Sequence, residues 1–415
     1  MSTKSKRGGA ISVLVYIAVI AVLGWGTMRV YHWFTSRSVG AAVEASVGKI
    51  EQARTLISEG KQQEAKELLL AVAEKPAGDN VGPSSLMLLA EMEETAGNKP
   101  QAIAYLERIT QEFPTSADRP KALLQYAKLL ESDSQFDKAK AVYEELRASA
   151  PADLRAPATT RLAKLTESAG NSASREAARE MYRQALQEAS VGSAAWEEAL
   201  DALGAVNVAL VFSPEPTSDS ETYVLEKGDS ITSIGNKKNT TQGMLLRANN
   251  LTEDARLDVG QRLKYTPKDF RIIIERSTCK LYLLDNKGVF KRYYTGLGMP
   301  GHETTLGSYK IGNKEKDPVW HKPGAGPIPS GDPANELGTR WMPLVPVQEA
   351  LPKDLGIHGT IRPETVGGYA SHGCARLVKD DVEELYDLVV RSTPVDIVET
   401  VTPEMLQVNP GNPAG

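Results

Sequence analysis

The sequence predicts a multidomain α+β protein with a transmembrane helix, an α-helical repeat, a small mixed module and a mainly-β C-terminal domain. Three observations predict this organisation. Residues 10–28 carry no charge, alanines recur at a fixed spacing within residues 41–210, and apolar residues alternate with polar ones from residue 269. A chain of 415 residues is too long for one hydrophobic core, which agrees with several domains.

The composition describes a folded protein whose partners are not nucleic acids. Hydrophobic residues at 41% and charged residues at 24% are typical of a globular chain. The net charge of -5 and the absence of long lysine or arginine runs exclude the basic surface that nucleic-acid binding requires. The two cysteines, Cys279 and Cys374, are too few for a disulfide framework, and their spacing matches no zinc motif.

Residues 10–30 are predicted to form a single-pass membrane anchor. The uncharged stretch Ala10–Met28 would rise about 28 Å as a helix, enough to cross a bilayer core. Basic residues in the tail of residues 1–9 favour a cytoplasmic N-terminus, which places the C-terminal domain on the exported, periplasmic side. A cleavable signal peptide is the alternative, although its apolar region is usually shorter and the bulky Tyr31–Phe34 follow here.

Residues 41–210 are predicted to be a helical repeat. One alanine recurs every 37 residues, at Ala65, Ala102 and Ala139, and a weaker fourth copy has Ala178. An apolar helical segment precedes each copy, so the unit is a pair of helices. The small alanines, with a proline twelve residues after two of them, resemble tetratricopeptide-type repeats, although the period exceeds the usual ~34 residues. We expect a solenoid core, and whether the repeats act as a spacer or bind a protein partner stays open.

A proline-containing polar stretch, residues 211–220, is predicted to be a semi-extended linker. Residues 221–268 then contain the motifs Tyr223-Val224, Gly228-Asp229-Ser230, Asn249-Asn250 and Gly260-Gln261-Arg262-Leu263. With these motifs the segment resembles a LysM module, which implies a strand-helix-helix-strand (βααβ) unit that binds N-acetylglucosamine-containing glycans such as peptidoglycan. A module that serves only as a spacer is the alternative, since Gly235 falls in the first helix where the family usually has alanine.

Residues 269–400 are predicted to form the mainly-β domain, followed by a tail at residues 401–415. Alternating apolar residues flank Asp285-Asn286-Lys287-Gly288, which is typical of a hairpin. Residues 313–335 are rich in proline and glycine, as in a long surface loop or lid. A helix is expected from Lys379 to Ser392, with acidic residues in its first turn.

The candidate site of this domain is Cys374, which lies in a segment with two histidines. A cysteine nucleophile needs a base that takes its proton and donors for the oxyanion, and His358, His372 and the flexible Gly373 offer both. The residues alone leave three interpretations open. Cys374 is a nucleophile, a small buried hydrophobic residue, or a zinc ligand together with the two histidines, for which a third or fourth ligand is not evident.

A family resemblance separates these interpretations. His358-Gly359-Thr360, Ser371-His372-Gly373-Cys374 thirteen residues after that histidine, and Arg376-Leu377 resemble the active-site signature of YkuD-type L,D-transpeptidase catalytic domains. Flanking motifs also resemble the family, namely Gly307-Ser308-Tyr309, Asn335-Glu336-Leu337-Gly338 with Arg340-Trp341, and Thr393-Pro394-Val395-Asp396-Ile397.

The resemblance implies a peptidoglycan L,D-transpeptidase of cell wall biogenesis that needs no metal and no cofactor. In this family a cysteine attacks the L-centre carbonyl of the third stem residue, D-alanine leaves, and the amine of a second stem completes a 3-3 cross-link. Carried over, Cys374 is the nucleophile and His358 the proton acceptor and donor. Gly373 and Cys374 would line the oxyanion site, and Ser371 and His372 would shape it.

Two residues near this motif stay open. Arg376 would either bind a substrate carboxylate or form a structural salt bridge within the domain. Glu336 stands where the family often has proline, which puts the preference for donor stems in doubt. His302 and His321 have no motif around them, although His321 in the proline-rich segment is a candidate for substrate contact.

Two alternatives to the transpeptidase remain. If water resolves the acyl-enzyme, the same site is an L,D-carboxypeptidase. If the repeats recruit wall-synthesis partners, the chain is a peptidoglycan-binding scaffold in which catalysis is secondary. We therefore expect stem peptides and glycan strands as ligands, the membrane as a partner of the N-terminal helix, and a protein as a possible partner of the repeats.

Overall fold

The computed structural model describes residues 40–75, 81–267, 269–321, 324 and 326–407. The tail at residues 1–9 and the anchor expected at residues 10–30 lie outside this range. Among the described residues, no helix has both the length and the apolar character to cross a membrane.

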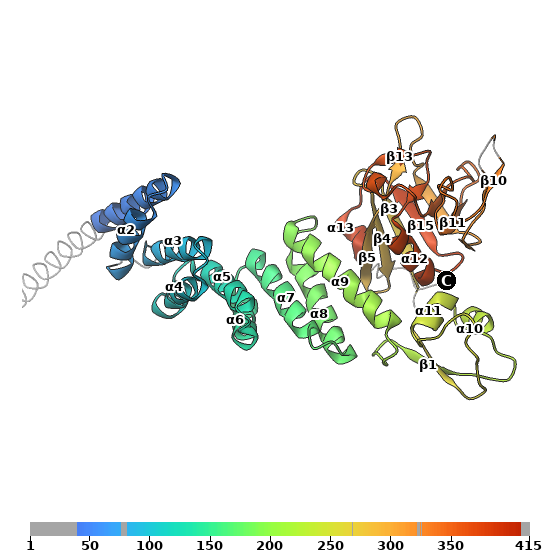
Figure 1. Ribbon diagram of the computed structural model, residues 1–415, viewed down its shortest axis with the longest axis horizontal. Coiled ribbons are helices and arrows are strands. Elements are labelled where there is room, and N and C mark those ends of the chain that lie inside the picture. Colours follow the sequence, from blue (N-terminus) through green and yellow to red (C-terminus); the bar gives the residue numbers. More distant parts are fainter. Residues whose placement is uncertain (1–39, 76–80, 268, 322–323, 325, 408–415) are drawn as a thin grey trace, which may run out of the picture. The chain divides into compact units, whose positions relative to one another are not determined.

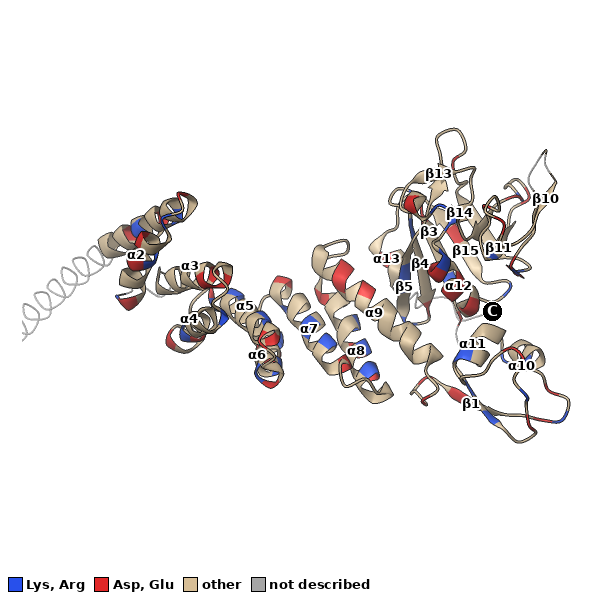
Figure 2. Ribbon diagram, in the orientation of Figure 1, with Lys and Arg blue, Asp and Glu red and all other residues tan. Residues whose placement is uncertain are grey.

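The chain divides into two compact units, Met1–Leu154 and Arg155–Gly415. The first consists of helices: residues 40–58 are helical, and they are followed by α2 (Gln62–Glu74), α3 (Val81–Thr95), α4 (Lys99–Glu112), α5 (Arg119–Ser132) and α6 (Phe136–Ser149). Charged residues of both signs are interspersed along these helices (Figure 2).

The alanines of the predicted repeat lie at the helix contacts. Ala65, Ala102 and Ala139, on α2, α4 and α6, have no exposed surface, and neither does Ala178 in the second unit. Neighbouring helices pack in sequence order. A methyl side chain at each crossing lets the backbones approach closely, so the prediction of paired helices is confirmed.

Three more helices follow, α7 (Ala152–Glu167), whose first residues precede the boundary at Leu154, and α8 (Ser172–Glu188) and α9 (Ala194–Phe212) in the second unit. The expected linker partly continues α9 and then folds back on α8. Ser218 donates to the Glu176 carboxylate at 2.7 Å through its backbone N–H, and Arg179 pairs with Asp219 at 3.2 Å. This stretch is therefore tied to the repeat, unlike the semi-extended linker that its prolines favoured.

The small module has the strand-helix-helix-strand order that the sequence predicts. Its elements are β1 (Glu221–Val224), α10 (Ile231–Lys237), α11 (Gln242–Arg247) and β2 (Arg262–Tyr265), and the two strands pair antiparallel. Ser230 caps α10 in a reciprocal pair of hydrogen bonds with Ser233. A Cβ atom at Gly235 would lie 3.0 Å from the Thr240 carbonyl oxygen, which explains why the helix tolerates glycine there.

The mainly-β domain is built on a nine-stranded sheet in the described part of the chain, with the strand order β14-β12-β11-β7-β15-β3-β4-β5 and β8 paired with β11. These strands are β3 (Arg271–Glu275), β4 (Lys280–Asp285), β5 (Gly288–Tyr294), β7 (Gly307–Ile311), β8 (Glu315–Lys316), β11 (Arg340–Pro346), β12 (Gly356–His358), β14 (Ala375–Arg376) and β15 (Pro394–Val398). The predicted hairpin joins β4 to β5, with Asp285 opposite Gly288.

Shorter elements surround the sheet. They are β6 (Leu297–Gly298), β9 (Trp320–His321), β10 (Pro327–Ile328), a 3-10 turn (Pro363–Thr365), β13 (Tyr369–Ser371), α12 (Lys379–Leu388) and α13 (Pro403–Leu406). The segment expected as a long loop therefore contains the short pair β9 and β10. Buried Asn335 fixes it by donating to the carbonyl oxygens of Pro318, Ile328 and Pro329.

Both faces of the β3-β4-β5 half of the sheet are buried. Residues alternate along β4, so that Leu281 and Leu283 enter the main core with α12, while Tyr282 and Leu284 pack on Trp196 and Leu200 of α9. Figure 1 shows α9 running beside β5 and β4. The last helix of the repeat is therefore part of the core of the β domain.

Polar contacts reinforce this interface. The buried guanidinium of Arg292 on β5 pairs with Glu197 and Asp201 of α9, and Asn207 donates to the Phe290 carbonyl oxygen at 2.8 Å. Gly204 lies so close to β5 that a Cβ atom would approach Lys291 Cγ to 2.9 Å. A glycine within a helix is costly by itself, so its presence here is explained by this close approach.

Candidate active site

The predicted site residues meet at the β12-β14 end of the sheet. These two strands are parallel, with Ile357 opposite Ala375 and His358 opposite Arg376. Side chains directly opposite each other point to the same face, and residues two apart along a strand do so as well. His358 and Arg376 therefore share one face of the sheet, and Cys374 lies directly before β14.

His358 is buried and held by backbone carbonyl groups. Its side chain is 3% exposed, Nδ1 lies 2.7 Å from the Gly359 carbonyl oxygen, and the ring centroid is 5.6 Å from that of Trp341. A carbonyl oxygen only accepts, so Nδ1 carries the proton and Nε2 is the basic nitrogen. Burial, with a smaller contribution from the charge of Arg376, lowers the pKa of His358 to about 4, and the imidazole is neutral at pH 7.

Cys374 is a half-buried thiol. Its Sγ donates to the Asp354 carbonyl oxygen at 3.7 Å, and no hydrogen bond joins Sγ to His358 among the described residues. Burial raises the pKa of the thiol, while a hydrogen bond from the Gly356 backbone lowers it in part. The site therefore holds a neutral thiol and a neutral imidazole at neutral pH.

Ser371 fixes the turn that presents Cys374. The buried hydroxyl donates to the Cys374 carbonyl oxygen at 2.7 Å and accepts from the Gly373 N–H at 3.1 Å. Gly373 has φ +117, and a Cβ atom there would lie 3.1 Å from Leu355 Cδ2, so only glycine fits. The Gly373 N–H, which the sequence led us to expect at the oxyanion site, is bound to the Ser371 hydroxyl in the structure.

Arg376 forms a salt bridge within the domain. It is 5% exposed, and its Nη2 lies 3.1 Å from Oε2 of Glu336, which also pairs with Arg362 at 3.0 Å. Of the two roles left open for Arg376, the structure shows the ion pair. Glu336 stands where the family often has proline. Its carboxylate is the partner of Arg376 and also lies near His358.

The loop that carries Glu336 packs on the histidine strand. A Cβ atom at Gly338 would lie 3.0 Å from Gly359 Cα, and one at Gly359 would lie 3.1 Å from the Leu337 carbonyl oxygen. The two motifs, far apart in sequence, are thus in backbone contact. Glycine at both positions is what allows this approach.

Sequence reasoning missed one residue at the site. His302 has its ring centroid 4.9 Å from that of His372, and its carbonyl oxygen is near Gly373. Both imidazoles are exposed. The contact depends on the parallel pairing of β13 with β6, which no local spacing around His302 could indicate. His321, by contrast, lies exposed on β9.

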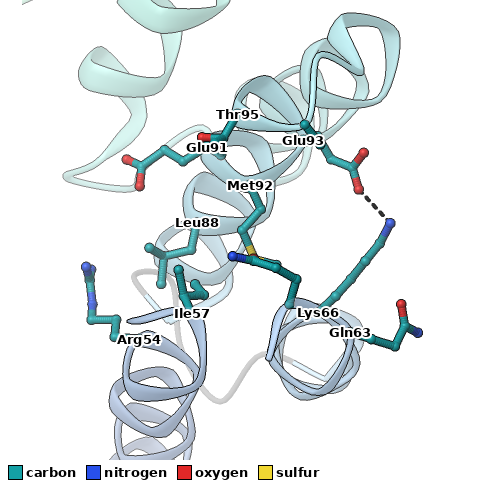
Figure 3. Close-up of a pocket in the computed structure, with 11 residues that line it drawn as sticks. Arg54, Ile57, Gln63, Lys66, Leu88, Glu91, Met92, Glu93 and Thr95 are labelled. Atoms are coloured by element: carbon teal, nitrogen blue, oxygen red, sulfur yellow. Dashed lines mark hydrogen bonds and ion pairs between the residues drawn. The ribbon is translucent and has the colours of Figure 1, made fainter. Parts of the chain in front are cut away.

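The helical unit has a concave site of its own. A cavity of about 610 Å³ lies between the helix at residues 40–58, α2 and α3, and Figure 3 shows Lys66 reaching toward Glu93 beside Leu88 and Met92. The Lys66 and Glu93 side chains pair at 2.5 Å. The mixture of apolar and charged lining residues is compatible with a polypeptide segment as ligand.

Three family models match parts of the chain. Residues 269–397 match the YkuD family, described as the L,D-transpeptidase catalytic domain, residues 223–266 match the LysM domain, and residues 84–116 match a tetratricopeptide repeat. Two Bacillus subtilis (strain 168) relatives, YqjB and YkuD, have names that class them provisionally as L,D-transpeptidases.

YqjB is 34% identical over 137 residues, which are 32% of this chain and 73% of YqjB. YkuD is 30% identical over 184 residues, which are 42% of this chain and 98% of YkuD. Among solved structures, a mutant L,D-transpeptidase from Enterococcus faecium is 22% identical and has a TM-score of 0.26, with 31% of this chain and 50% of that chain covered. The chain thus spans about half the length of that enzyme. The sequence matches carry the assignment, and this chain belongs to the YkuD-type L,D-transpeptidase family, whose catalytic domain acts on peptidoglycan.

Proposed function

We propose that the chain is a membrane-anchored transpeptidase that forms 3-3 cross-links between peptidoglycan stems through an acyl-enzyme on Cys374. The observation that carries this proposal is a half-buried thiol directly before β14 and a neutral, buried imidazole on β12, the strand that pairs with β14. A nucleophile and a base in this relation are what acyl transfer needs.

The first half of the reaction forms the thioester. The Cys374 side chain turns from Asp354 toward His358, whose Nε2 takes the thiol proton as sulfur attacks the carbonyl of the third stem residue. Contacts between a nucleophile and its base often close only when substrate binds. Because Gly373 is bound to Ser371, the N–H of Cys374 itself is the donor that we assign to the oxyanion. His358 then protonates the leaving amine as D-alanine departs.

The second half transfers the acyl group. The side-chain amine of another stem loses its proton to His358 and attacks the thioester, which forms the new amide bond. The carbon–sulfur bond breaks, and the sulfur recovers its proton from His358. Peptide-bond energy is kept in the thioester, so the cycle balances without a nucleotide.

The other site residues have supporting roles in this proposal. Ser371 and Gly373 hold the turn, the Glu336 pair keeps Arg376 in place beside His358, and His372 with His302 forms the exposed rim. The uncharged residues 10–28 support the anchor, and the LysM match supports glycan binding near the catalytic domain. We further propose that the cavity of the helical unit binds a protein partner.

A product analysis tests the function. Purified protein is incubated with disaccharide-tetrapeptide, and mass spectrometry should show dimers that have lost one D-alanine. Tripeptide monomers without dimers would replace the transferase by the L,D-carboxypeptidase. Unchanged tetrapeptide would overturn both and favour the scaffold.

A further inference from the structure

A cavity of about 1200 Å³ lies where the LysM-type module meets the catalytic domain. One wall comes from α10, α11 and the loops beside them, and the other from β8, β11 and α12. Its size is sufficient for several sugar residues of a polymer. It is separate from Cys374 and His358, neither of which lines it.

The two walls are fixed against each other. Thr241 at the start of α11 donates its hydroxyl to the Asp387 carbonyl oxygen of α12, and Arg247 pairs with the Asp387 carboxylate at 3.3 Å. A Cβ atom at Gly243 would come within 2.2 Å of that carboxylate, so the helices touch through a glycine. Arg247 also stacks on Phe212, with its guanidinium carbon 3.4 Å from the ring centroid. These contacts therefore hold the two walls of the cavity together within the second unit.

The module wall is polar and mostly neutral. Thr232, Asn236 and Asn239 are exposed along it, and Gln242 donates to the Thr232 hydroxyl at 2.9 Å. Hydroxyl and amide groups in such density suit the hydroxyl and acetamido groups of amino sugars. Asp229, in the turn before α10, contributes a carboxylate to this wall, and that carboxylate is already paired with Lys237 at 2.8 Å.

The cavity as a whole has an excess of cations. Five basic side chains line it against three acidic ones, the basic residues being Arg247, Lys314, Lys316, Arg340 and Arg391 and the acidic ones Asp229, Glu253 and Asp387. The partly buried Arg340 has long ion pairs, at 3.7 and 4.0 Å. Its Nη1 donates to the Thr339 carbonyl oxygen, and within the described residues its Nε has no hydrogen-bond partner. The catalytic wall therefore suits a ligand that carries a carboxylate.

We propose that this cavity is a composite glycan site, in which the module binds the sugars and the catalytic-domain cations bind a carboxylate of a stem peptide on the same strand. The inference rests on the proposed function for the identity of the polymer. It adds the requirement that the two domains bind one strand jointly. A neutral glycan would use one wall, and a stem-bearing glycan would use both.

Strand β11 connects this cavity to the catalytic site. Arg340 faces the cavity, while the next residue, Trp341, packs on the ring of His358. The Arg340 carbonyl oxygen also accepts from the N–H of Gly359 at 3.2 Å. A strand held in the cavity thus lies one β-strand away from the base, which raises the local concentration of its other stems at Cys374.

Two variants with opposite expected effects test the cationic wall. Lys316 pairs with Glu253 at 2.5 Å across the cavity, so both Lys316→Ala and Glu253→Gln break the same interdomain pair. Lys316→Ala also removes the cation and should weaken binding of a stem-bearing glycan about five-fold. Glu253→Gln frees the cation and should leave binding equal or tighter.

Binding is measured with the full chain in a Cys374→Ala background, so that no turnover occurs. The probes are a tetrasaccharide of peptidoglycan with tripeptide stems and a neutral N-acetylglucosamine oligomer of equal length. Asn236→Ala should weaken both probes, Lys316→Ala only the first, and Lys310→Ala, an exposed lysine outside the cavity, neither. Added salt should weaken only the stem-bearing probe.

The composite site is overturned if Lys316→Ala and Glu253→Gln change binding of the stem-bearing glycan in the same direction, or if neither changes it. Failure of the proposed function has a different signature, because it would appear as missing dimers from disaccharide-tetrapeptide in the enzyme with Cys374 intact. Lys310→Ala, an exposed position outside both the cavity and the catalytic site, should leave that turnover unchanged.

Discussion

The two ends of the catalytic sheet differ in the length of their strands and in the polarity of their buried residues. At the β3-β4-β5 end the strands have five to seven residues, both faces are apolar and buried, and α9 covers the outer one. At the β12-β14 end the strands have two or three residues, and the buried groups include His358, Arg376 and Ser371.

The difference separates stability from chemistry. The long-stranded end buries large apolar side chains, which contribute most of the free energy of folding. The short-stranded end keeps polar groups out of water and orders them through glycine turns and single hydrogen bonds, which costs stability. Substitutions at the two ends should therefore have different readouts, and the two cysteines lie one at each end.

The largest effect should come from Cys374→Ala. Removal of the nucleophile should lower turnover by about 10⁴-fold or more. The thermal midpoint should stay nearly unchanged, because the contacts of the sulfur with the Asp354 carbonyl oxygen and the Gly356 backbone are weak. The matched control is Cys279→Ala beside β4, where the thiol is 1% exposed. That variant should lose about 1 kcal/mol of stability and retain turnover. Residual cross-linking by Cys374→Ala at the original rate would remove the assigned nucleophile.

Trp196→Ala should have the largest effect on stability. Trp196 of α9 is 4% exposed and packs on Tyr282 and Leu284, so truncation should cost about 3–5 kcal/mol in the free energy of unfolding. Val345→Ala, at a 52% exposed position of the same sheet, should cost less than about 1 kcal/mol. Equal denaturation midpoints for the two variants would show that α9 is not part of the core.

Acid should destabilise the active-site end through His358. The folded pKa of about 4 lies below the unfolded value of 6.5, so between these pH values only the unfolded chain takes up the proton. Stability is unaffected above pH 7 and falls as the pH decreases, by on the order of 3 kcal/mol at pH 4. Urea midpoints of the wild type and His358→Gln, followed by tryptophan fluorescence, should diverge below pH 6.5, with the wild type losing more. Parallel pH profiles would contradict the depressed pKa.

The smallest expected effect is a difference in stability between alanine substitutions at two helical glycines. Gly204→Ala should cost about 1 kcal/mol, because its methyl group meets Lys291 at 2.9 Å and outweighs the gain in helix propensity. Gly48→Ala has nothing within 4 Å and should instead stabilise its helix, by up to about 1 kcal/mol. Thermal melts that shift in the same direction for both variants would argue against the tight contact between α9 and β5.

Local patterns in the sequence were sufficient to predict three features of the chain. The alanine period predicted the paired helices, alternation predicted the β4-β5 hairpin, and the motif predicted that His358 and Cys374 belong together. The role of α9 was missed, although the helix is apolar on nearly all sides, from Trp196 to Val211, and such a helix must be buried on two faces. His302 and the partner of Arg376 depend on pairings between distant segments, which no spacing in the chain reveals.

The shared helix α9 has a consequence for how such chains are assembled from modules. Sequence matches place the start of the catalytic family at residue 269, yet a recombinant or evolutionary exchange made there would leave Ile273, Tyr282 and Leu284 of the incoming sheet without a cover. A functional exchange would need its junction near Leu154, where the two compact units meet along the chain. The segment that has to be exchanged as a whole is therefore longer than the matched catalytic domain, and it includes the end of the repeat.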